Sequence, residues 1–302
     1  MDAIAPTLRQ LRYLTALYET GHFGRAAQAC HVTQSTLSSG IRELETLLDT
    51  SLVERSKRMV RFTPLGERVA HKAYEVLRQA DELVDLVSAS GSPLSSSLRM
   101  GVIPTIAPFY LPKVLPALRA SYPNLKLYLK EDMSHIVCDA LSRGQLDVVL
   151  LALPFACGEV EEEHLFNDPF YAAYRPEEKE GLEFNKKAVE PSSLAKKRLL
   201  LLEEGHCLKD HALAACGHPQ LRSDGSLLGT SLHTLVQMVD NRLGVTLLPK
   251  IAIDGGILDG TRLEISPLAG STPYREIGLV WRKNSPRRDE FLLLAEFLKK
   301  QK

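Results

Sequence analysis

Apolar positions recur at helical spacing over the first part of the chain. A first repeat places leucine at every third position: Leu8, Leu11, Leu14 and Leu17. This spacing predicts an amphipathic helix that ends at Gly21. A short alanine-rich stretch follows and breaks at His31 and Val32, after which Thr33 can cap another helix. Two helices that meet at a tight turn are typical of a helix-turn-helix.

The helix after Thr33 has one apolar and one polar face. Its inward stripe is expected at Leu37, Ile41, Leu44 and Leu48. Short amide and hydroxyl side chains and an arginine share the other face: Gln34, Ser35, Ser38, Ser39 and Arg42. Such side chains can hydrogen-bond the edges of DNA bases. A small helical domain whose polar face is simply solvated explains this pattern equally well.

A basic stretch and a long helical repeat come next. Residues 53–63, VERSKRMVRFT, set four cations against Glu54 alone, a local charge of +3 that suits phosphates. The cations are Arg55, Lys57, Arg58 and Arg61. From Pro64 to Ser90, apolar positions alternate four and three apart: Val69, Ala73, Val76, Ala80, Leu83 and Val87. This heptad seam favours a helix that pairs with a second copy, and packing on its own domain is the alternative.

The remainder of the sequence has an α/β pattern. Residues 88–97, SASGSPLSSS, have almost no apolar side chains and predict an interdomain hinge. Beyond them, apolar runs such as LRMGVI and LDVVLLAL alternate with helical stretches, and the alternation restarts at residues 198–204, RLLLLEE. This pattern predicts an α/β fold with a largely parallel sheet in two similar subdomains. A ligand cleft is expected at the carboxyl ends of the strands.

Composition narrows the function classes. The chain has 302 residues, enough for more than one domain, and its 37 Lys and Arg balance 37 Asp and Glu. Any attraction to nucleic acid must therefore be local. The longest apolar run, residues 148–156, is far shorter than the roughly 18 residues that a membrane-spanning helix needs, and the start of the chain does not resemble a signal peptide. We expect a soluble, cytoplasmic protein that does not bind a membrane.

Five cysteines are spread along the chain: Cys30, Cys138, Cys157, Cys207 and Cys216. Their odd number and wide spacing predict no disulfide framework, and no Cys-x-x-Cys pair suggests zinc. No metal or other cofactor is expected. Cys30, Cys138 and Cys157 are interpreted as packing thiols.

Cys207 and Cys216 have different settings on one predicted helix. Cys207 follows Gly205 and His206 at the helix start, where the helix N-terminus and Lys209 favour a thiolate. Cys216 follows a run of alanines that should keep it buried and protonated. The alternative is that both cysteines are ordinary small apolar residues.

An intact helix would hold these two sulfur atoms apart. Nine steps of helix span about 13 Å, whereas a disulfide needs Cα atoms roughly 4.4–6.8 Å apart. Oxidation of Cys207 to a sulfenic acid and its capture by Cys216 would therefore require the helix to unwind. Such a step would turn a chemical event into a change of shape.

The N-terminal part of the chain resembles a known DNA-binding family. Residues 23–67, FGRAAQACHVTQSTLSSGIRELETLLDTSLVERSKRMVRFTPLGE, are similar to the winged helix-turn-helix of LysR-type transcriptional regulators. The resemblance implies DNA contacts through Gln34, Ser35, Thr36, Ser38, Arg42, Arg55, Lys57 and Arg58. Ser35 stands where the family usually has proline, which leaves the base preference near this position open.

The resemblance also implies a domain plan and an assembly. The parts are a winged helix-turn-helix at 1–63, a dimerising linker helix at 64–90, a hinge at 91–97, and a periplasmic-binding-protein-like regulatory domain at 98–302. Subdomain I would comprise residues 98–169 and 273–302, and subdomain II residues 170–272. A homodimer or homotetramer would bind double-stranded DNA at partly palindromic sites.

Residues 202–217 and 230–249 resemble, more narrowly, the hydrogen-peroxide-sensing members of the LysR family. This resemblance implies that Cys207 is the peroxidatic cysteine and Cys216 the resolving one. It implies a peroxide pocket made of Thr105, Ser134, His206, Asp210 and Arg275, with Ser134 where relatives have threonine. It further implies an activator of oxidative-stress genes, not an enzyme, that works with RNA polymerase and is reset by a thiol reductant such as glutaredoxin or thioredoxin.

Other interpretations stay open. The cleft could bind a small organic anion through Thr105, Thr230 and Arg275, with structural cysteines. The chain could also be a thiol peroxidase, which the DNA-binding module disfavours. Each pocket residue has a structural alternative: Thr105 as a helix cap, His206 on the surface, Asp210 as a partner of the helix dipole, and Arg275 in an ion pair.

Overall fold

The structure is a computed structural model that describes most of the chain. The described residues are 5–55, 60–89, 93–194, 197–203, 205, 207–215, 228–270 and 273–301, with the side chains of 55, 85–89, 215 and 228 left out. They form two units, Met1–Ser88 and Ala89–Lys302, and each is described by itself. Across these ranges, no helix has the length and apolar character that crossing a bilayer requires.

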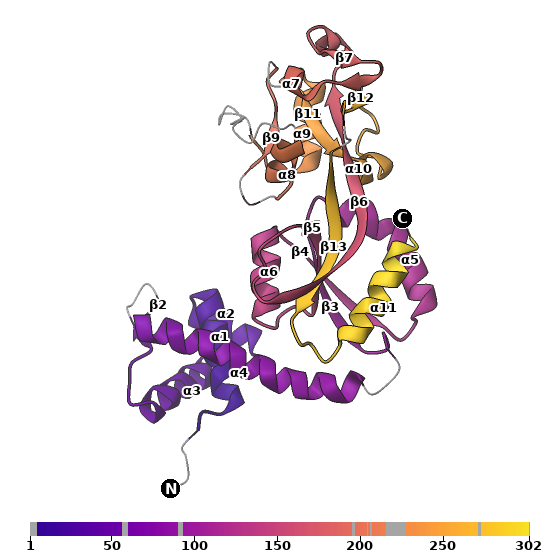
Figure 1. The fold of residues 1–302 in the computed structure, drawn as a ribbon. Coiled ribbons are helices and arrows are strands. Elements are labelled where there is room, and N and C mark those ends of the chain that lie inside the picture. The colour runs from indigo at the N-terminus through magenta and orange to yellow at the C-terminus, as the bar shows by residue number, and fades with distance from the viewer. Residues whose placement is uncertain are drawn as a thin grey trace. The chain divides into compact units, whose positions relative to one another are not determined.

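The N-terminal unit is a helix-turn-helix with a two-stranded wing and a long helix (Figure 1). Its elements are α1 (Leu8–Thr20), α2 (Phe23–Ala29), α3 (Gln34–Leu47), β1 (Val53–Arg55), β2 (Val60–Phe62) and α4 (Pro64–Ala89). The two strands pair antiparallel. The helices predicted from the apolar repeats are confirmed, and α1 ends at Gly21, whose φ of 59° lies in the left-handed region that favours glycine.

The core of this unit comes from the inward stripes of its helices. Leu37, Ile41 and Leu44 of α3 are fully buried, as the spacing predicts. The prediction for Leu48 is wrong: its side chain is 36% exposed because it caps the C-terminal end of α3 instead of lying within the helix. Within α3, Gly40 packs directly against the Tyr13 ring, so that α1 and α3 approach closely.

The wing is attached to α3 by one carboxylate. Glu45 accepts hydrogen bonds from the backbone N–H groups of Leu52 at 2.9 Å and Val53 at 3.1 Å. These bonds fix the start of β1 relative to the polar face of α3. The tip of the wing, with Lys57 and Arg58, lies outside the described residues, as does the Arg55 side chain.

Replacing Gly66 with alanine is expected to destabilise this unit. The N–H of Gly66 donates to the Thr63 hydroxyl at 2.9 Å, and a Cβ at this position would overlap the carbonyl group of Leu52. Because that obstacle is backbone, the expected loss is about 1–3 kcal/mol of unfolding free energy, measured by urea denaturation. Arg68→Ala, an exposed change in the same helix, is the control. An equal effect of the two substitutions would contradict the close approach.

The heptad positions of α4 serve two roles. Ala73 is buried and Val69 is half-buried in the core of the same unit, so the alternative of packing on its own domain is correct for these two. Val76 and Leu83 are exposed, Leu83 by 67%, and the Val87 side chain lies outside the described residues. The exposed positions leave room for a second copy, and that pairing stays a prediction.

The C-terminal unit is an α/β structure around a seven-stranded sheet. The strand order is β11-β6-β13-β5-β3-β4, with β12 also paired to β6. The strands are β3 (Ser97–Val102), β4 (Lys126–Glu131), β5 (Val148–Leu153), β6 (Val160–Tyr174), β11 (Thr246–Pro249), β12 (Glu264–Pro267) and β13 (Tyr274–Arg282). Two further strand pairs are β7 (Phe184–Asn185) with β8 (Ala188–Val189) and β9 (Leu201–Leu202) with β10 (Leu228–Gly229).

The prediction of a largely parallel sheet is wrong. Within this sheet, the pairs of β3 with β4 and with β5 are parallel, whereas β13 and β6 pair antiparallel with all their neighbours. β6 and β13 run side by side and antiparallel (Figure 1). They connect one half of the unit, built around β3, β4 and β5, with the other half, built around β11 and β12. Residues 160–169 of β6 pair with β13, and 170–174 pair with β11 and β12.

Helices pack on the sheet in both halves of the C-terminal unit. They are α5 (Ala107–Ser121), α6 (Ser134–Ser142), α7 (Pro191–Leu194), α8 (Cys207–Ala215), α9 (Leu232–Asp240), α10 (Lys250–Asp254) and α11 (Arg288–Lys299), with a 3-10 turn η1 at Pro176–Lys179. Side chains from both halves join one continuous hydrophobic core.

The end of the predicted hinge packs on the C-terminal unit. Leu94 is fully buried, and its N–H donates to the Glu290 carboxylate at 3.1 Å. Leu94 is the one large apolar residue of the described part of SASGSPLSSS, and burial of its side chain draws residues 93–97 onto the domain. Residues 93–97 thus pack on the C-terminal unit through Leu94, residues 90–92 lie outside the described ranges, and the hinge stays a prediction.

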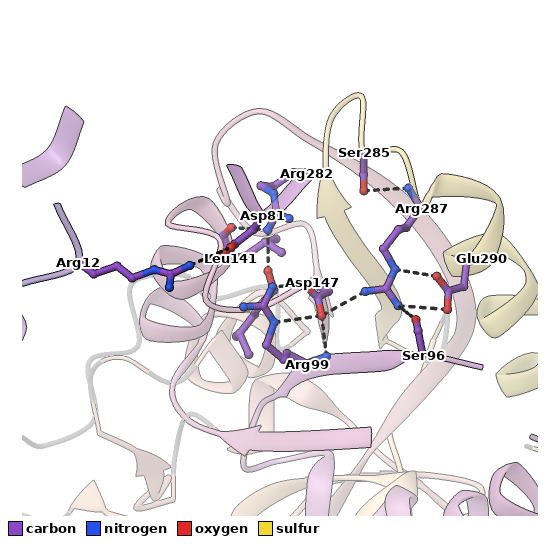
Figure 2. Close-up of polar contacts among 11 residues, drawn as sticks. Arg12, Asp81, Ser96, Arg99, Leu141, Asp147, Arg282, Ser285, Arg287 and Glu290 are labelled. Atoms are coloured by element: carbon purple, nitrogen blue, oxygen red, sulfur yellow. Dashed lines mark hydrogen bonds and ion pairs between the residues drawn. The ribbon is translucent and has the colours of Figure 1, made fainter. Parts of the chain in front are cut away.

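A buried charge cluster holds this segment in place (Figure 2). Arg287 lies between two carboxylates, 2.7 Å from Glu290 and 3.5 Å from Asp147, and it donates to the Ser96 hydroxyl at 3.5 Å. Asp147 also binds Arg99 at 2.6 Å. Because the carboxylates and Arg287 are nearly fully buried, removing any one of them would leave a buried charge without its partner.

The interpretation of Cys138 and Cys157 as independent packing thiols is wrong. Cys138 lies in α6 and Cys157 in the loop between β5 and β6, and the structure joins them in a disulfide. Both elements border β5, which brings the two cysteines together although they are 19 positions apart. Cys30 is free, as predicted, and burial followed by the charge of Glu19 raises its pKa.

Candidate functional site

The predicted DNA-contacting face of α3 is open to solvent. Gln34, Ser35, Thr36 and Arg42 are exposed, and Ser38 is half-buried. The Arg42 guanidinium lies over Ser38, donating from Nη2 to Oγ at 3.3 Å and from Nε to the carbonyl oxygen at 3.4 Å. The face thus presents amide, hydroxyl and guanidinium groups that can bind bases and phosphates.

The serine at position 35 takes part in the helix cap. Thr33 accepts from the N–H of Thr36 at 3.2 Å, and its hydroxyl also lies 2.9 Å from Ser35 Oγ and 2.8 Å from Thr36 Oγ1. These contacts order the first turn of α3 by hydrogen bonding where proline would order it through its fixed φ.

Cys207 is the first residue of α8 and is nearly buried, with 6% exposure. The turn before it contains Gly205 at φ +98°, a value that favours glycine. A Cβ on Gly205 would fall 2.8 Å from Met133 Sδ, so this turn lies against the start of α6, next to Ser134. The two partners predicted nearby, His206 and Cys216, lie outside the described residues.

Arg275 is held in a fixed geometry at the start of β13. It is fully buried, and Asp168 is its direct cross-strand neighbour on β6. Arg275 donates from Nε to Asp168 Oδ2 at 2.9 Å and from Nη1 to Thr105 Oγ1 at 2.8 Å. The other Asp168 oxygen accepts from the N–H of Ile251 at 2.9 Å. Such a clamp fixes the orientation of the Arg275 guanidinium, whose charge is paired with Asp168.

Ser134 contributes a hydroxyl with no protein partner among the described residues. Its side chain is 1% exposed, and its Oγ is buried. A buried hydroxyl without a partner costs free energy, so a polar ligand or water at this position would stabilise it. Of the predicted pocket, the structure thus brings Thr105 to Arg275, and it places Met133 and His135, the neighbours of Ser134, against the turn before Cys207. Asp210 is exposed.

The structural alternatives have mixed outcomes. Thr105 is not the cap of α5, because Ile106 takes that position without a side-chain hydrogen bond. The ion-pair interpretation of Arg275 is correct. Asp210 lies in the first turn of α8, as the dipole interpretation expects. Thr230, a residue of the organic-anion alternative, is exposed.

His211 and Asp168 belong to this site although sequence inspection missed both. His211 lies one helical turn after Cys207, on the same side of α8, and its Nδ1 is buried without a partner in the described structure. Burial is the largest cause that lowers the pKa of His211, and the charge of Arg275 lowers it further. The charge of Asp210 and a hydrogen bond to the Pro154 carbonyl raise this pKa, but by less. The four-residue spacing between Cys207 and His211 is the pattern that could have identified His211 from the sequence. No local pattern marks Asp168.

The lowered pKa of His211 predicts a pH-dependent stability. An unfolded chain takes up the imidazole proton near pH 6.5, above the pKa of the folded state. The free energy of unfolding should therefore fall as the pH drops below about 6.5, until the folded histidine is protonated as well. His211→Gln should flatten this slope in urea titrations at about pH 5–7, compared with His164→Gln at an exposed position. If the unfolding free energy depends on pH with the same slope in wild type and His211→Gln, His211 is not the cause of the pH dependence.

Comparison with known proteins identifies both units. Residues 8–67 match the family described as bacterial regulatory helix-turn-helix protein, lysR family, and residues 91–302 match the LysR substrate binding domain. Among curated proteins, the HTH-type transcriptional regulator EstR of Acinetobacter baylyi is 41% identical over 99% of this chain and 98% of its own. The DNA-binding transcriptional dual regulator OxyR of Escherichia coli is 38% identical over 97% of this chain and 94% of its own.

Solved structures agree with these matches. A full-length OxyR variant from Pseudomonas aeruginosa superposes with a TM-score of 0.76 at 36% identity, covering 97% of this chain and 94% of that one. A hydrogen-peroxide-bound mutant of Corynebacterium glutamicum OxyR gives a TM-score of 0.65 at 32% identity, covering 98% and 92%. This chain is therefore a member of the LysR family of bacterial helix-turn-helix transcription regulators, and OxyR proteins are among its relatives.

Proposed function

We propose that this protein senses hydrogen peroxide through Cys207 and Cys216 and regulates oxidative-stress genes in response. The observation that carries the proposal is the buried Ser134 hydroxyl, which has no partner among the described residues; Met133 and His135, on either side of Ser134, lie against Gly205 in the turn that leads to Cys207. The clamped Arg275–Thr105 pair adds a positive charge and a second hydroxyl. Donors of this kind can hold both oxygens of a peroxide and stabilise the hydroxide that leaves.

The proposed reaction needs two thiols and one peroxide. The Cys207 thiolate attacks one peroxide oxygen, the O–O bond breaks, and hydroxide leaves and takes up a proton, which yields a sulfenic acid and water. The Cys216 thiol then displaces the sulfenic oxygen as a second water and forms the disulfide. Because α8 is helical from Cys207 to Ala215, this disulfide requires the helix to unwind.

The DNA-binding unit would convert this change into gene regulation. We infer a cytoplasmic homodimer or homotetramer, paired through the exposed positions of α4, on partly palindromic DNA. RNA polymerase would be its partner at activated promoters. A dithiol protein such as glutaredoxin or thioredoxin would reset the disulfide by thiol exchange.

Peptide mass and DNA footprints test the proposal together. After mild peroxide treatment, the peptide that contains residues 207–216 should lose two hydrogen atoms and become resistant to alkylation. The DNA footprint should change at the same peroxide concentration and return after reduction. A footprint that changes while this peptide keeps both free thiols would overturn the assignment.

Replacing Arg42 with alanine is expected to weaken binding to all DNA sequences. Loss of one phosphate contact should reduce the slope of log affinity against log salt by about 1. Binding to a matched and a scrambled site at several salt concentrations measures both effects, with Arg9→Ala on exposed α1 surface as the control. A loss confined to the matched site would instead assign base recognition to Arg42.

A small organic effector is the second candidate, favoured by the 41% identity to EstR, whose name mentions no peroxide. A cavity of about 200 Å³ lies beside Asp168, lined in part by Tyr110, Lys113 and Lys250. The Lys113 amine could attract a carboxylate, whereas Lys250 already pairs with the Asp254 carboxylate of the same lining. Calorimetry with small carboxylates on thiol-alkylated protein separates the candidates, because an effector should still bind when the thiols are blocked.

A further inference from the structure

A second thiol pair lies inside the C-terminal unit. Cys138 and Cys157 are joined with their Cα atoms 4.9 Å apart, within the roughly 4.4–6.8 Å range that a disulfide allows without backbone movement. Their side chains are 5% and 7% exposed. The backbone therefore holds the two sulfur atoms in reach of each other in the folded state, unlike Cys207 and Cys216.

Cys138 is connected to the Cys207 site through α6. It lies one helical turn after Ser134, so both side chains occupy the same side of the helix. The residue before Ser134, Met133, contacts the turn at Gly205. Movement of α6 would shift the Ser134 hydroxyl, which has no partner in the described part of the chain, relative to Cys207.

Cys157 is connected to the same site through its loop. Pro154, at the start of the loop between β5 and β6, accepts a hydrogen bond from His211 of α8. His211 follows Cys207 by one helical turn. A bond between Cys138 and Cys157 therefore joins two segments, one of which contacts α8 and the other the turn before it.

We propose that Cys138 and Cys157 form a second, reversible redox couple that locks α6 to the loop between β5 and β6 and so sets the geometry around Cys207. Disulfides in reducing compartments are usually transient and regulatory, which favours a couple that opens and closes over a permanent brace. The couple goes beyond the proposed peroxide switch, since its formation needs neither Cys207 nor Cys216.

The chemistry of this couple balances with one peroxide. One thiolate attacks a peroxide oxygen, the O–O bond breaks, and water and a sulfenic acid form; the other thiol then displaces a second water. The two sulfur atoms are oxidised by two electrons in total, and both peroxide oxygens leave as water. A dithiol reductant reverses the bond by exchange. Because both thiols are buried, oxidation proceeds through local opening of the loop.

The couple is tested in a full-length chain that lacks the other pair. In the Cys207→Ser, Cys216→Ser background, peroxide should link the peptides that contain Cys138 and Cys157, and dithiothreitol should separate them. The oxidised form should melt about 5–10 °C higher than the reduced form, because the bond closes a loop of about 20 residues. If both cysteines can still be alkylated after peroxide treatment, no disulfide has formed, and the proposal is overturned.

Two controls make this result specific. Adding Cys157→Ala to the same background should remove the peroxide-dependent rise in melting temperature, whereas adding Cys30→Ser should preserve it. A rise that persists without Cys157 would assign the effect to another group and reject the couple. Should Cys157→Ala fail to fold, the linked peptide in the parent background still decides the question.

The effect on Cys207 is measured in the chain with all five cysteines. After the Cys138–Cys157 bond is formed, Cys207 should react with peroxide about 3–10-fold faster than in Cys157→Ala, because the bond preorganises Ser134 and the loop. Equal rates would overturn the link to the Cys207 site. Failure of Cys207 to react in either protein, with the second pair still linking, would reject the proposed sensor and leave the couple intact.

Discussion

Replacing Cys207 with serine is expected to abolish the peroxide response of DNA binding. A serine hydroxyl stays protonated and is a far weaker nucleophile than a thiolate, so oxidation at this position should slow by about three orders of magnitude or more. The variant should still fold and bind DNA, because Ser and Cys differ little in volume and the helix-turn-helix belongs to the other unit. Footprints across a peroxide titration measure the response.

Cys30→Ser is the matched control for this substitution. Cys30 belongs to the N-terminal unit, and burial together with the Glu19 charge raises its pKa, which disfavours the reactive thiolate. Its replacement should leave the peroxide response unchanged. A full response in Cys207→Ser would exclude Cys207 as the sensor, and the effector hypothesis would then take its place.

Local signals in the sequence predicted the N-terminal unit well. The leucine repeat, the stop at Gly21 and the cap at Thr33 act within a few residues, and each has the predicted structure. Leu48 failed because a repeat cannot tell the last helical turn from the cap that follows it. The polar face of α3 was likewise readable from spacing alone.

Long-range pairing could not be read from the sequence in the same way. Strand runs predicted an α/β fold, but the antiparallel directions of β6 and β13 depend on which strands become neighbours. That choice also places Asp168 opposite Arg275, although 107 positions separate them. Cys138 and Cys157 show the same limit, since neither has a local motif and only the fold brings them together.

Replacing Arg275 with glutamine is expected to destabilise the C-terminal unit strongly. It removes the cation that pairs with Asp168, a carboxylate only 2% exposed, and leaves Thr105 without its donor. Breaking one side of a buried pair costs about 3–5 kcal/mol of unfolding free energy, because the remaining charge is buried alone. Urea denaturation measures the loss. Arg288→Gln, which breaks an exposed pair with Glu161, should cost at most about 1 kcal/mol.

A second substitution separates the structural and chemical roles of Arg275. Adding Asp168→Asn to Arg275→Gln removes the stranded charge, so much of the lost unfolding free energy should return. The peroxide reactivity of Cys207 should nevertheless stay low, because no positive charge remains at this position to stabilise the departing hydroxide. Recovery of both stability and reactivity would show that Arg275 only holds the fold, and the pocket would then need another cation.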